Sequence, residues 1–199
     1  MKICRYILKS DPFKKARMGI VLDDEGIVID PQTIWACDYE REGFARAWER
    51  ATRHMPTSLH YLLNHFDDPH DALEESYGLY LFLKKVGDLN LKNGVSIFHK
   101  LSDITLVNPM DRISTYRDFY AHEKHVAAGF KKRNEPIPQA WYEIPAYYKG
   151  ATQGFIGDGE EILWPSYTDV LDYELELAMI VGRDGKNIKE DDALSLIHI

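Results

Sequence analysis

The segment Leu171–Leu177 alternates apolar and acidic residues, which is the pattern of a β-strand. Successive side chains of a strand point to opposite faces, so Asp172, Glu174 and Glu176 are expected together on one face. Carboxylates held this close repel one another, and a bound divalent cation removes that repulsion. A half-exposed antiparallel strand with an acidic solvent face has the same alternation. The pattern predicts a strand and leaves both interpretations of its acidic face open.

Short strands are predicted at the beginning of the chain. Apolar and β-branched residues favour strands over Ile3–Leu8, Ala16–Leu22 and Gly26–Ile29. Asp23-Asp24-Glu25-Gly26 is typical of the turn that leads into the third of them. Two later runs, Val95–Phe98 and Ile104–Val107, are also strand-like.

Helices are predicted between these two groups of strands. Apolar side chains recur at helical spacing over Arg41–Arg53, over the residues that follow Pro56-Thr57-Ser58, and over Asp71–Lys85. We interpret these stripes as core-facing rather than as cofactor contacts. A group of strands followed by a group of helices in this way indicates an α+β fold.

The chain changes character near Pro109, where we place a domain boundary. Residues 1–108 are predicted to form a small β-rich domain with helices, and residues 109–199 a second domain. In the second domain we expect a helix over Ser114–Arg133, ended by Pro136-Ile137-Pro138, and a hairpin turn at Gly157-Asp158-Gly159.

Composition excludes several classes of protein. The net charge of −8 argues against a general nucleic-acid binder, which needs a basic surface for phosphates. The chain has 2 cysteines, too few for a disulfide framework or a cysteine-rich zinc site. Charged residues interrupt the N-terminus too early for a signal peptide, and no segment is apolar for the length of a membrane span. We therefore expect a cytoplasmic protein without a nucleic-acid or membrane partner.

Two further clusters carry residues suited to chemistry. On the predicted helix, Asp118, His122 and His125 have the spacing of one helical face. His122-Glu123-Lys124-His125 is one residue short of the zinc-protease motif, so that interpretation is poor, and solvated or locally paired histidines remain an alternative. Downstream, Tyr147-Tyr148-Lys149-Gly150 is suited either to binding a carboxylate or enolate-like oxygen or to aromatic packing at a turn.

Other catalytic signatures are absent from the sequence. The glycines of Gly154–Gly159 lack the strand–loop–helix context of a phosphate-binding loop. No Gly-x-Ser-x-Gly nucleophile elbow is present, so covalent serine catalysis has no support.

Taken in order, these segments resemble the fumarylacetoacetate hydrolase family. The resemblance rests on Asp118-Phe119-Tyr120 with His125, on Pro145-x-x-Tyr148-x-Gly150, and on Leu171-Asp172-x-Glu174-x-Glu176. It covers roughly the second half of the chain. It implies a β-rich N-terminal domain followed by the first part of a mixed β-roll catalytic domain.

The resemblance also implies roles for individual residues. Three carboxylates would bind a divalent cation, Mg²⁺, Mn²⁺ or Ca²⁺: Asp118, Glu174 and Glu176. His125 would be the general base that activates water, and the substrate contacts would be Tyr120, Tyr148 and, by a looser correspondence, Arg133. Asp172 would have a supporting role. The aspartate at position 118 leans toward the fumarylacetoacetase-like branch of the family, whose smaller acylpyruvase-type relatives carry asparagine there.

The implied activity is metal-dependent hydrolysis of a carbon–carbon bond in a β-diketone or acylpyruvate. The implied partners are a small dicarbonyl or 2-oxo acid substrate and a second copy of the chain in a homodimer. The alternatives are a decarboxylase, hydratase or isomerase of a related 2-oxo acid, or an inactive metal-binding fragment of such an enzyme.

The family pattern continues beyond Ile199 with a further metal-ligating aspartate and an acid that orients the histidine. The resemblance therefore implies an incomplete metal shell and a chain that is inactive alone. In addition, Leu194–Ile199 matches the peptide that a transposase sequencing adapter encodes when it is read in frame. We expect the natural sequence to continue differently after Ala193.

Overall fold

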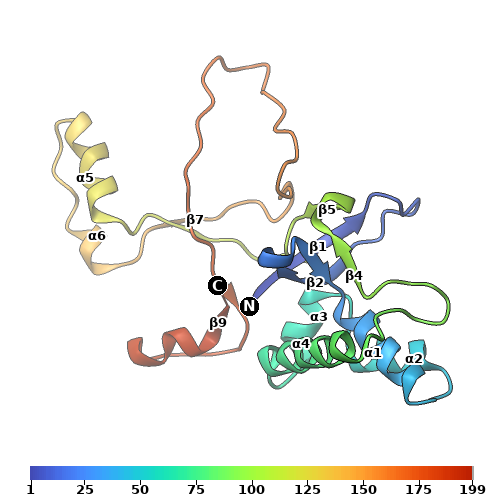
Figure 1. The fold of residues 1–199 in the computed structure, drawn as a ribbon. Coiled ribbons are helices and arrows are strands. Elements are labelled where there is room, and N and C mark those ends of the chain that lie inside the picture. Colours follow the sequence, from blue (N-terminus) through green and yellow to red (C-terminus); the bar gives the residue numbers. More distant parts are fainter. Residues whose placement is uncertain (199) are drawn as a thin grey trace. The chain divides into compact units, whose positions relative to one another are not determined.

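The computed structural model describes residues 1–198, which form helices and antiparallel strands in two compact units (Figure 1). One unit consists of residues 1–111 and 156–199, and the other of residues 112–155. The mixture of helices with an antiparallel sheet confirms the α+β class. The domain limits at 108 and 109 stay a prediction.

A five-stranded antiparallel sheet organises the first unit, with the strand order β4-β3-β2-β1-β5. Its strands are β1 (Lys2–Leu8), β2 (Arg17–Leu22), β3 (Ile27–Ile29), β4 (Phe98–Lys100) and β5 (Ile104–Val107). Four of the five predicted strands agree to within one residue. The run at Val95–Phe98 differs, because pairing with β3 begins only at Phe98.

The turn between β2 and β3 forms where the sequence predicts it. Asp23–Glu25 is a short 3₁₀ helix, and Gly26 ends it with a φ of 65°. A left-handed backbone costs glycine little because glycine has no Cβ. This turn lets two neighbouring segments pair directly as β2 and β3.

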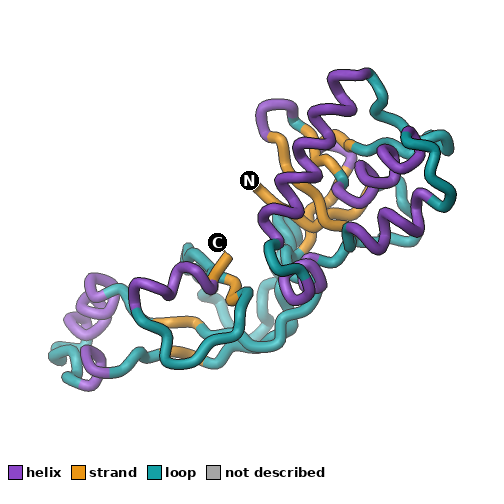
Figure 2. Tube along the Cα trace, turned by 90° about the horizontal axis from the view of Figure 1, so that it is seen from below, coloured by secondary structure: helices purple, strands orange, loops and turns teal. Residues whose placement is uncertain are grey.

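Four helices accompany the sheet: α1 (Pro31–Arg41), α2 (Ala47–His54), α3 (Leu59–His65) and α4 (Pro69–Val86). In Figure 2 these helices lie beside the strands of the sheet. The helix after Pro56 and the helix over Asp71–Lys85 are confirmed as α3 and α4. The prediction of one helix over Arg41–Arg53 is wrong, because Gly43, with a φ of 76°, separates α1 from α2.

Three of the four helices in the first unit, α1, α3 and α4, begin with a side-chain cap. Asp30 accepts a hydrogen bond from the Thr33 amide at α1, Ser58 caps α3, and Asp68 caps α4. Proline follows the cap in α1 and α4, where its missing N–H leaves no unmet donor. The Asp30-Pro31 pair is therefore a start signal for α1 that apolar spacing alone does not reveal.

The core of this unit lies between one sheet face and the helices. Alternate strand residues such as Ile20 and Ile29 are 1% and 0% exposed. They belong to one cluster with helix residues that include Ile34, Leu62, Leu73 and Leu83. The opposite sheet face carries a smaller cluster of Tyr6, Val28 and Ile104. Strand alternation explains this division. Most residues of the predicted helical stripes belong to the core, but Phe44 and Leu81 are exposed.

Residues 112–155 form the second unit. Its elements are β6 (Asp118–Phe119), α5 (Glu123–Lys132), α6 (Ala140–Glu143) and β7 (Tyr147–Tyr148), and β6 pairs antiparallel with β7. The prediction of a helix from Ser114 is wrong in its first half. The backbone of Asp118–Tyr120 bonds to a neighbouring strand, so it cannot also make helical bonds, and the helix begins at Glu123.

The strand predicted over Leu171–Leu177 is absent from the structure. Residues 171–179 have no regular structure, and the short strand β8 (Ile180–Val181) follows them. Further on are a 3₁₀ helix, η3 (Glu190–Leu196), and β9 (Ile197–His198), which pairs with β8. Alternation alone does not make a strand, because the backbone must also form a hydrogen-bonded ladder with a neighbouring strand, and no ladder is assigned over residues 171–179.

The glycine pair at Gly157 and Gly159 is part of a turn, as predicted, but strands do not flank it. Among the described residues, no helix has both the length and the apolar character needed to cross a bilayer.

Candidate functional site

The β6–β7 pairing brings two predicted site residues together. Its register places Asp118 opposite Tyr148 and Phe119 opposite Tyr147. The Tyr120 amide then donates to the Ala146 carbonyl at 3.0 Å, which extends the pairing by one residue. Residues almost thirty positions apart in the sequence thereby become direct neighbours.

Tyr120 also lies against the helix that carries His125. The two rings are 5.6 Å apart between centroids and nearly perpendicular, at 86°. A Cβ added at Gly129, one turn further along α5, would lie 3.2 Å from the Tyr120 hydroxyl. The tyrosine therefore occupies the space between β6 and α5, and the general-base candidate is its neighbour.

Packing against Tyr116 explains why the Tyr148-x-Gly150 pattern has glycine at position 150. A Cβ at Gly150 would lie 2.1 Å from a ring carbon of Tyr116, so the ring needs the space that glycine leaves. Any larger residue would displace Tyr116 and the strand beside it.

Trp141 holds the other end of the Tyr120 backbone. Its indole N–H donates to the Tyr120 carbonyl at 2.7 Å. With the bond to Ala146, both backbone groups of Tyr120 are engaged. The sequence analysis missed Trp141, because a lone tryptophan in a loop carries no motif.

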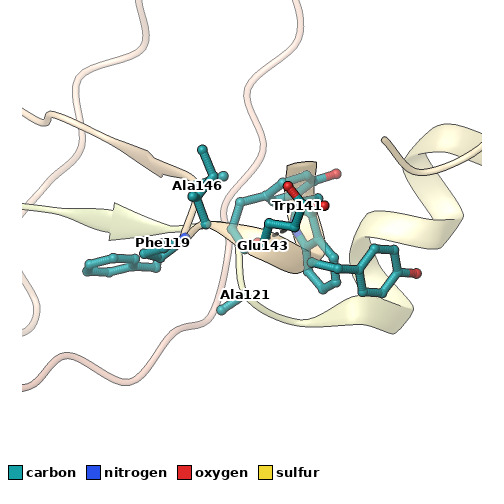
Figure 3. Close-up of a pocket in the computed structure, with 9 residues that line it drawn as sticks. Phe119, Ala121, Trp141, Glu143 and Ala146 are labelled. Atoms are coloured by element: carbon teal, nitrogen blue, oxygen red, sulfur yellow. Dashed lines mark hydrogen bonds between the residues drawn. The ribbon is translucent and has the colours of Figure 1, made fainter. Parts of the chain in front are cut away.

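A cavity of about 270 Å³ opens beside these residues. Figure 3 shows Phe119, Trp141, Glu143 and Ala146 around it, with Tyr120 also in its wall. On its rim, the Tyr142 hydroxyl donates to a carboxylate oxygen of Glu123 at 2.9 Å. That hydrogen bond raises the pKa of the Tyr142 phenol.

Arg133 caps the C-terminal end of α5. Its guanidinium lies over the Phe130 ring, 4.3 Å from the centroid, and its Nε is 3.3 Å from a Glu135 carboxylate oxygen. Both partners belong to its own end of the helix. The substrate-binding role of Arg133 stays a prediction.

Glu174 and Glu176 belong to the other compact unit, in the irregular stretch 171–179. Both are exposed, and Asp118 is half-buried. Within residues 1–198, no three His, Cys, Asp or Glu side chains are grouped so as to hold a metal ion. The chemistry of the donor set still fits a hard divalent cation, since all three are carboxylates. The metal-ligand assignment stays a prediction.

A buried ionic cluster lies in the first unit, and the sequence analysis did not single it out. Asp30 is 1% exposed and forms an ion pair with Arg17. It also accepts a hydrogen bond from the Tyr6 hydroxyl at 2.9 Å. Burial alone would raise the pKa of Asp30, but the Arg17 charge and the hydrogen bonds outweigh it and hold that pKa below its ordinary value. Because its groups satisfy one another, we assign this cluster to stability.

Comparison with known proteins identifies the second half of the chain. Residues 114–199 match the family model described as fumarylacetoacetate (FAA) hydrolase C-terminal. Over these residues, the chain is similar to the fumarylacetoacetate hydrolase family. All the site residues predicted from the family pattern, from Asp118 to Glu176, lie within the matched range.

Several known proteins are similar to part of the chain. Mitochondrial oxaloacetate tautomerase FAHD2A of Homo sapiens is 24% identical over 149 residues, which are 66% of this chain and 46% of that protein. An uncharacterized protein of Methanocaldococcus jannaschii is 32% identical over 112 residues, 55% of this chain and 41% of its own. Mitochondrial oxaloacetate tautomerase fahd2 of Xenopus laevis is 33% identical over 63 residues, 32% and 18% respectively. The chain thus spans less than half the length of these relatives.

Proposed function

We propose that this protein acts, with a divalent cation, on a small β-dicarbonyl or 2-oxo acid, and that it hydrolyses a carbon–carbon bond of an acylpyruvate-type substrate. The observation that carries the proposal is the arrangement of Asp118, Tyr120, His125 and Tyr148 around the β6–β7 pair, inside the range that matches the family. The proposal includes residues 109–199 as the first part of a mixed β-roll catalytic domain.

In this proposal, Asp118, Glu174 and Glu176 hold Mg²⁺, Mn²⁺ or Ca²⁺. When bound, such a cation polarises carbonyl oxygens and compensates the charge of an enolate. A substrate with two neighbouring carbonyl oxygens suits it, because hard cations prefer oxygen ligands.

His125 is the proposed general base. It takes a proton from water, and the resulting hydroxide adds to the distal carbonyl carbon. The bond between that carbon and the neighbouring methylene then breaks, which yields a carboxylic acid and the enolate of a 2-oxo acid. The protonated His125 returns its proton to the enolate carbon, and the carboxylic acid ionises to solvent. Tyr120 and Tyr148, placed beside His125 and Asp118, orient the substrate, and Arg133 is the proposed partner of its carboxylate.

A second candidate is an isomerase of a 2-oxo acid. It is favoured by the relatives from Homo sapiens and Xenopus laevis, which are named oxaloacetate tautomerases. Tautomerisation needs a base that moves a proton between carbon and oxygen, and no water has to attack. The same histidine would serve in both reactions.

Metal binding tests the first part of the proposal. Calorimetric titration with Mn²⁺ or Mg²⁺ is expected to show binding that Glu174→Gln and Asp118→Asn each weaken at least about tenfold, because each removes a charged ligand. Glu161→Gln removes an equal charge elsewhere and is expected to leave binding unchanged. Equal binding by all three variants, or none by the parent protein, would contradict the metal site.

The His125→Ala variant of the full-length protein tests the general base. Turnover is expected to fall by about two to four orders of magnitude, while Mn²⁺ affinity stays as in the parent protein. If the variant loses the metal together with its activity, His125 is a ligand or a structural residue instead.

Two substrates separate the candidate reactions. Release of pyruvate from an acylpyruvate would identify the hydrolase, whereas faster conversion of enol to keto oxaloacetate without cleavage would identify the isomerase. Metal binding without either reaction would leave a non-catalytic metal-binding protein on the same scaffold.

We further propose a homodimer, which light scattering of the purified protein tests. Cytoplasmic localisation also stays a prediction, since the human and frog relatives are named mitochondrial proteins. Fractionation of cells that produce the tagged protein would test it.

A further inference from the structure

The cavity beside Tyr120 is a second feature of the candidate site. Four of its nine lining residues are aromatic: Phe119, Tyr120, Trp141 and Tyr142. The indole of Trp141 forms part of the wall and also bonds the Tyr120 carbonyl at 2.7 Å. A group in this cavity would therefore contact the residues that hold Tyr120 beside His125.

The cavity wall carries negative charge without any positive charge. Glu143 is its single charged lining residue, and none of the nine is basic. A second carboxylate, that of Glu123, is not part of the lining but accepts the hydrogen bond from the lining residue Tyr142. The Arg117 guanidinium lies over the Tyr147 ring, 5.4 Å from the centroid, and Arg117 is not one of the lining residues.

We propose that this cavity receives the acyl group of the substrate, and that it selects an uncharged apolar or aromatic group over one that ends in a carboxylate. The inference rests on the proposed function, because it assigns the remainder of an acylpyruvate to a place beside Tyr120. It narrows the substrate class to acylpyruvates whose acyl group is uncharged, because an acyl group with its own carboxylate is disfavoured in the cavity.

The size of the cavity agrees with such an occupant. An apolar protein cavity of about 150 Å³ is large enough to bind benzene. The cavity here, at about 270 Å³, has room for a phenyl ring or a chain of several carbons. Aromatic walls favour a flat ring through stacked or edge-to-face contacts.

Electrostatics supply the selectivity. A distal carboxylate in this cavity would lose part of its hydration and meet Glu143, with no basic lining side chain to compensate it. An uncharged group loses no such hydration. Removing the Glu143 charge should therefore change the selectivity and leave the apolar affinity nearly constant.

The experiment compares butanoylpyruvate and succinylpyruvate, which have equal chain lengths and differ in the terminal carboxylate, and adds benzoylpyruvate as the aromatic probe. Binding to the Mg²⁺-loaded protein is followed by NMR through the Trp141 indole N–H signal, assigned with Trp141→Phe. Butanoylpyruvate and benzoylpyruvate are expected to shift this signal, and succinylpyruvate to bind about tenfold more weakly.

Glu143→Gln is the decisive variant, because an exposed side chain can be changed without disturbing the packing of Trp141. It is expected to bring succinylpyruvate to within about threefold of butanoylpyruvate. Glu161→Gln, in the other unit, is the control with the same change of net charge and is expected to keep the tenfold difference.

Equal affinity of the parent protein for butanoylpyruvate and succinylpyruvate would overturn the proposal. A Glu143→Gln variant with the same selectivity as the parent protein would also overturn it. The indole signal does not depend on turnover, so the outcomes of the two proposals are separable. Selective binding without cleavage would contradict the hydrolase and support the cavity assignment. Cleavage of all three probes at equal kcat/KM would support the hydrolase and contradict the cavity assignment.

Discussion

Asp30 links three parts of the first unit through its carboxylate. It caps α1, pairs with Arg17 of β2 and accepts from Tyr6 of β1. We expect Asp30→Ala to lower the free energy of unfolding by about 3 to 5 kcal/mol, because Arg17 would lose its buried partner. Urea denaturation measures this change. Asp24→Ala, at an exposed turn position, should change it by less than about 0.5 kcal/mol.

The histidine beside this cluster makes stability depend on pH. Burial lowers the pKa of His99 from its ordinary value of 6.5; Asp30 and Asp103 oppose that shift, and Arg17 adds to it. A group with a lowered folded pKa takes up its proton more readily in the unfolded chain, so acid favours unfolding. We expect the urea concentration at the unfolding midpoint to decrease as the pH is lowered from 7.5 to 5.5. The His99→Gln variant should show a smaller decrease. A midpoint independent of pH over this range would contradict the assignment.

At the scale of elements, Gly19 makes the close packing of β2 possible. A Cβ at this position would lie 2.3 Å from Val28 Cγ2 and 2.9 Å from a Tyr6 ring carbon. We expect Gly19→Ala to destabilise the protein by about 1 to 3 kcal/mol, because neither buried neighbour has room to move. Thermal or urea unfolding would measure this loss.

Gly78 provides the matched control. It lies in α4, and a Cβ there would meet nothing within 4 Å. Gly78→Ala is expected to stabilise the protein by up to about 1 kcal/mol, since alanine favours the helical conformation. Equal effects of the two substitutions would show that helix or strand propensity dominates over packing.

The elements that sequence reasoning predicted well have local causes. β1, β2 and β3 follow from runs of strand-forming residues separated by turns, and α3 and α4 from apolar spacing with caps at Ser58 and Asp68. The errors have non-local causes. Residues 118–120 are strand-like because Ala146–Tyr148 pairs with them, which their own sequence does not reveal.

At the scale of the whole molecule, the stretch 171–179 is the segment where a strand was predicted and none is assigned. Tyr173 and Leu175 are 83% and 93% exposed, although their spacing is that of a half-buried strand. We expect the backbone amides of 171–177 to exchange with deuterium within seconds, and those of β1 to be protected for far longer. Strong protection of 171–177 would show that this segment is paired in solution.

The candidate site was predictable in its chemistry and only partly in its arrangement. The residue types and spacings from Asp118 to Glu176 indicated the family, and residues 114–199 match it. Asp118 lies opposite Tyr148 because β6 pairs with β7. Tyr120 contacts His125 because α5 begins just after β6. Trp141 and the cavity had no signal in the sequence.

The sequence by itself determined the class of the fold, most local elements and the residue types of the candidate site, because these depend on residues close together in the chain. The tertiary structure alone decided which segments pair, that Asp30 is buried among its partners, and that Trp141 holds Tyr120. It also decided against a strand over Leu171–Leu177. The physical reason is the same throughout, because strand pairing and burial depend on contacts between residues distant in the sequence. The alternation of apolar and polar residues in one segment does not specify the segment with which it pairs.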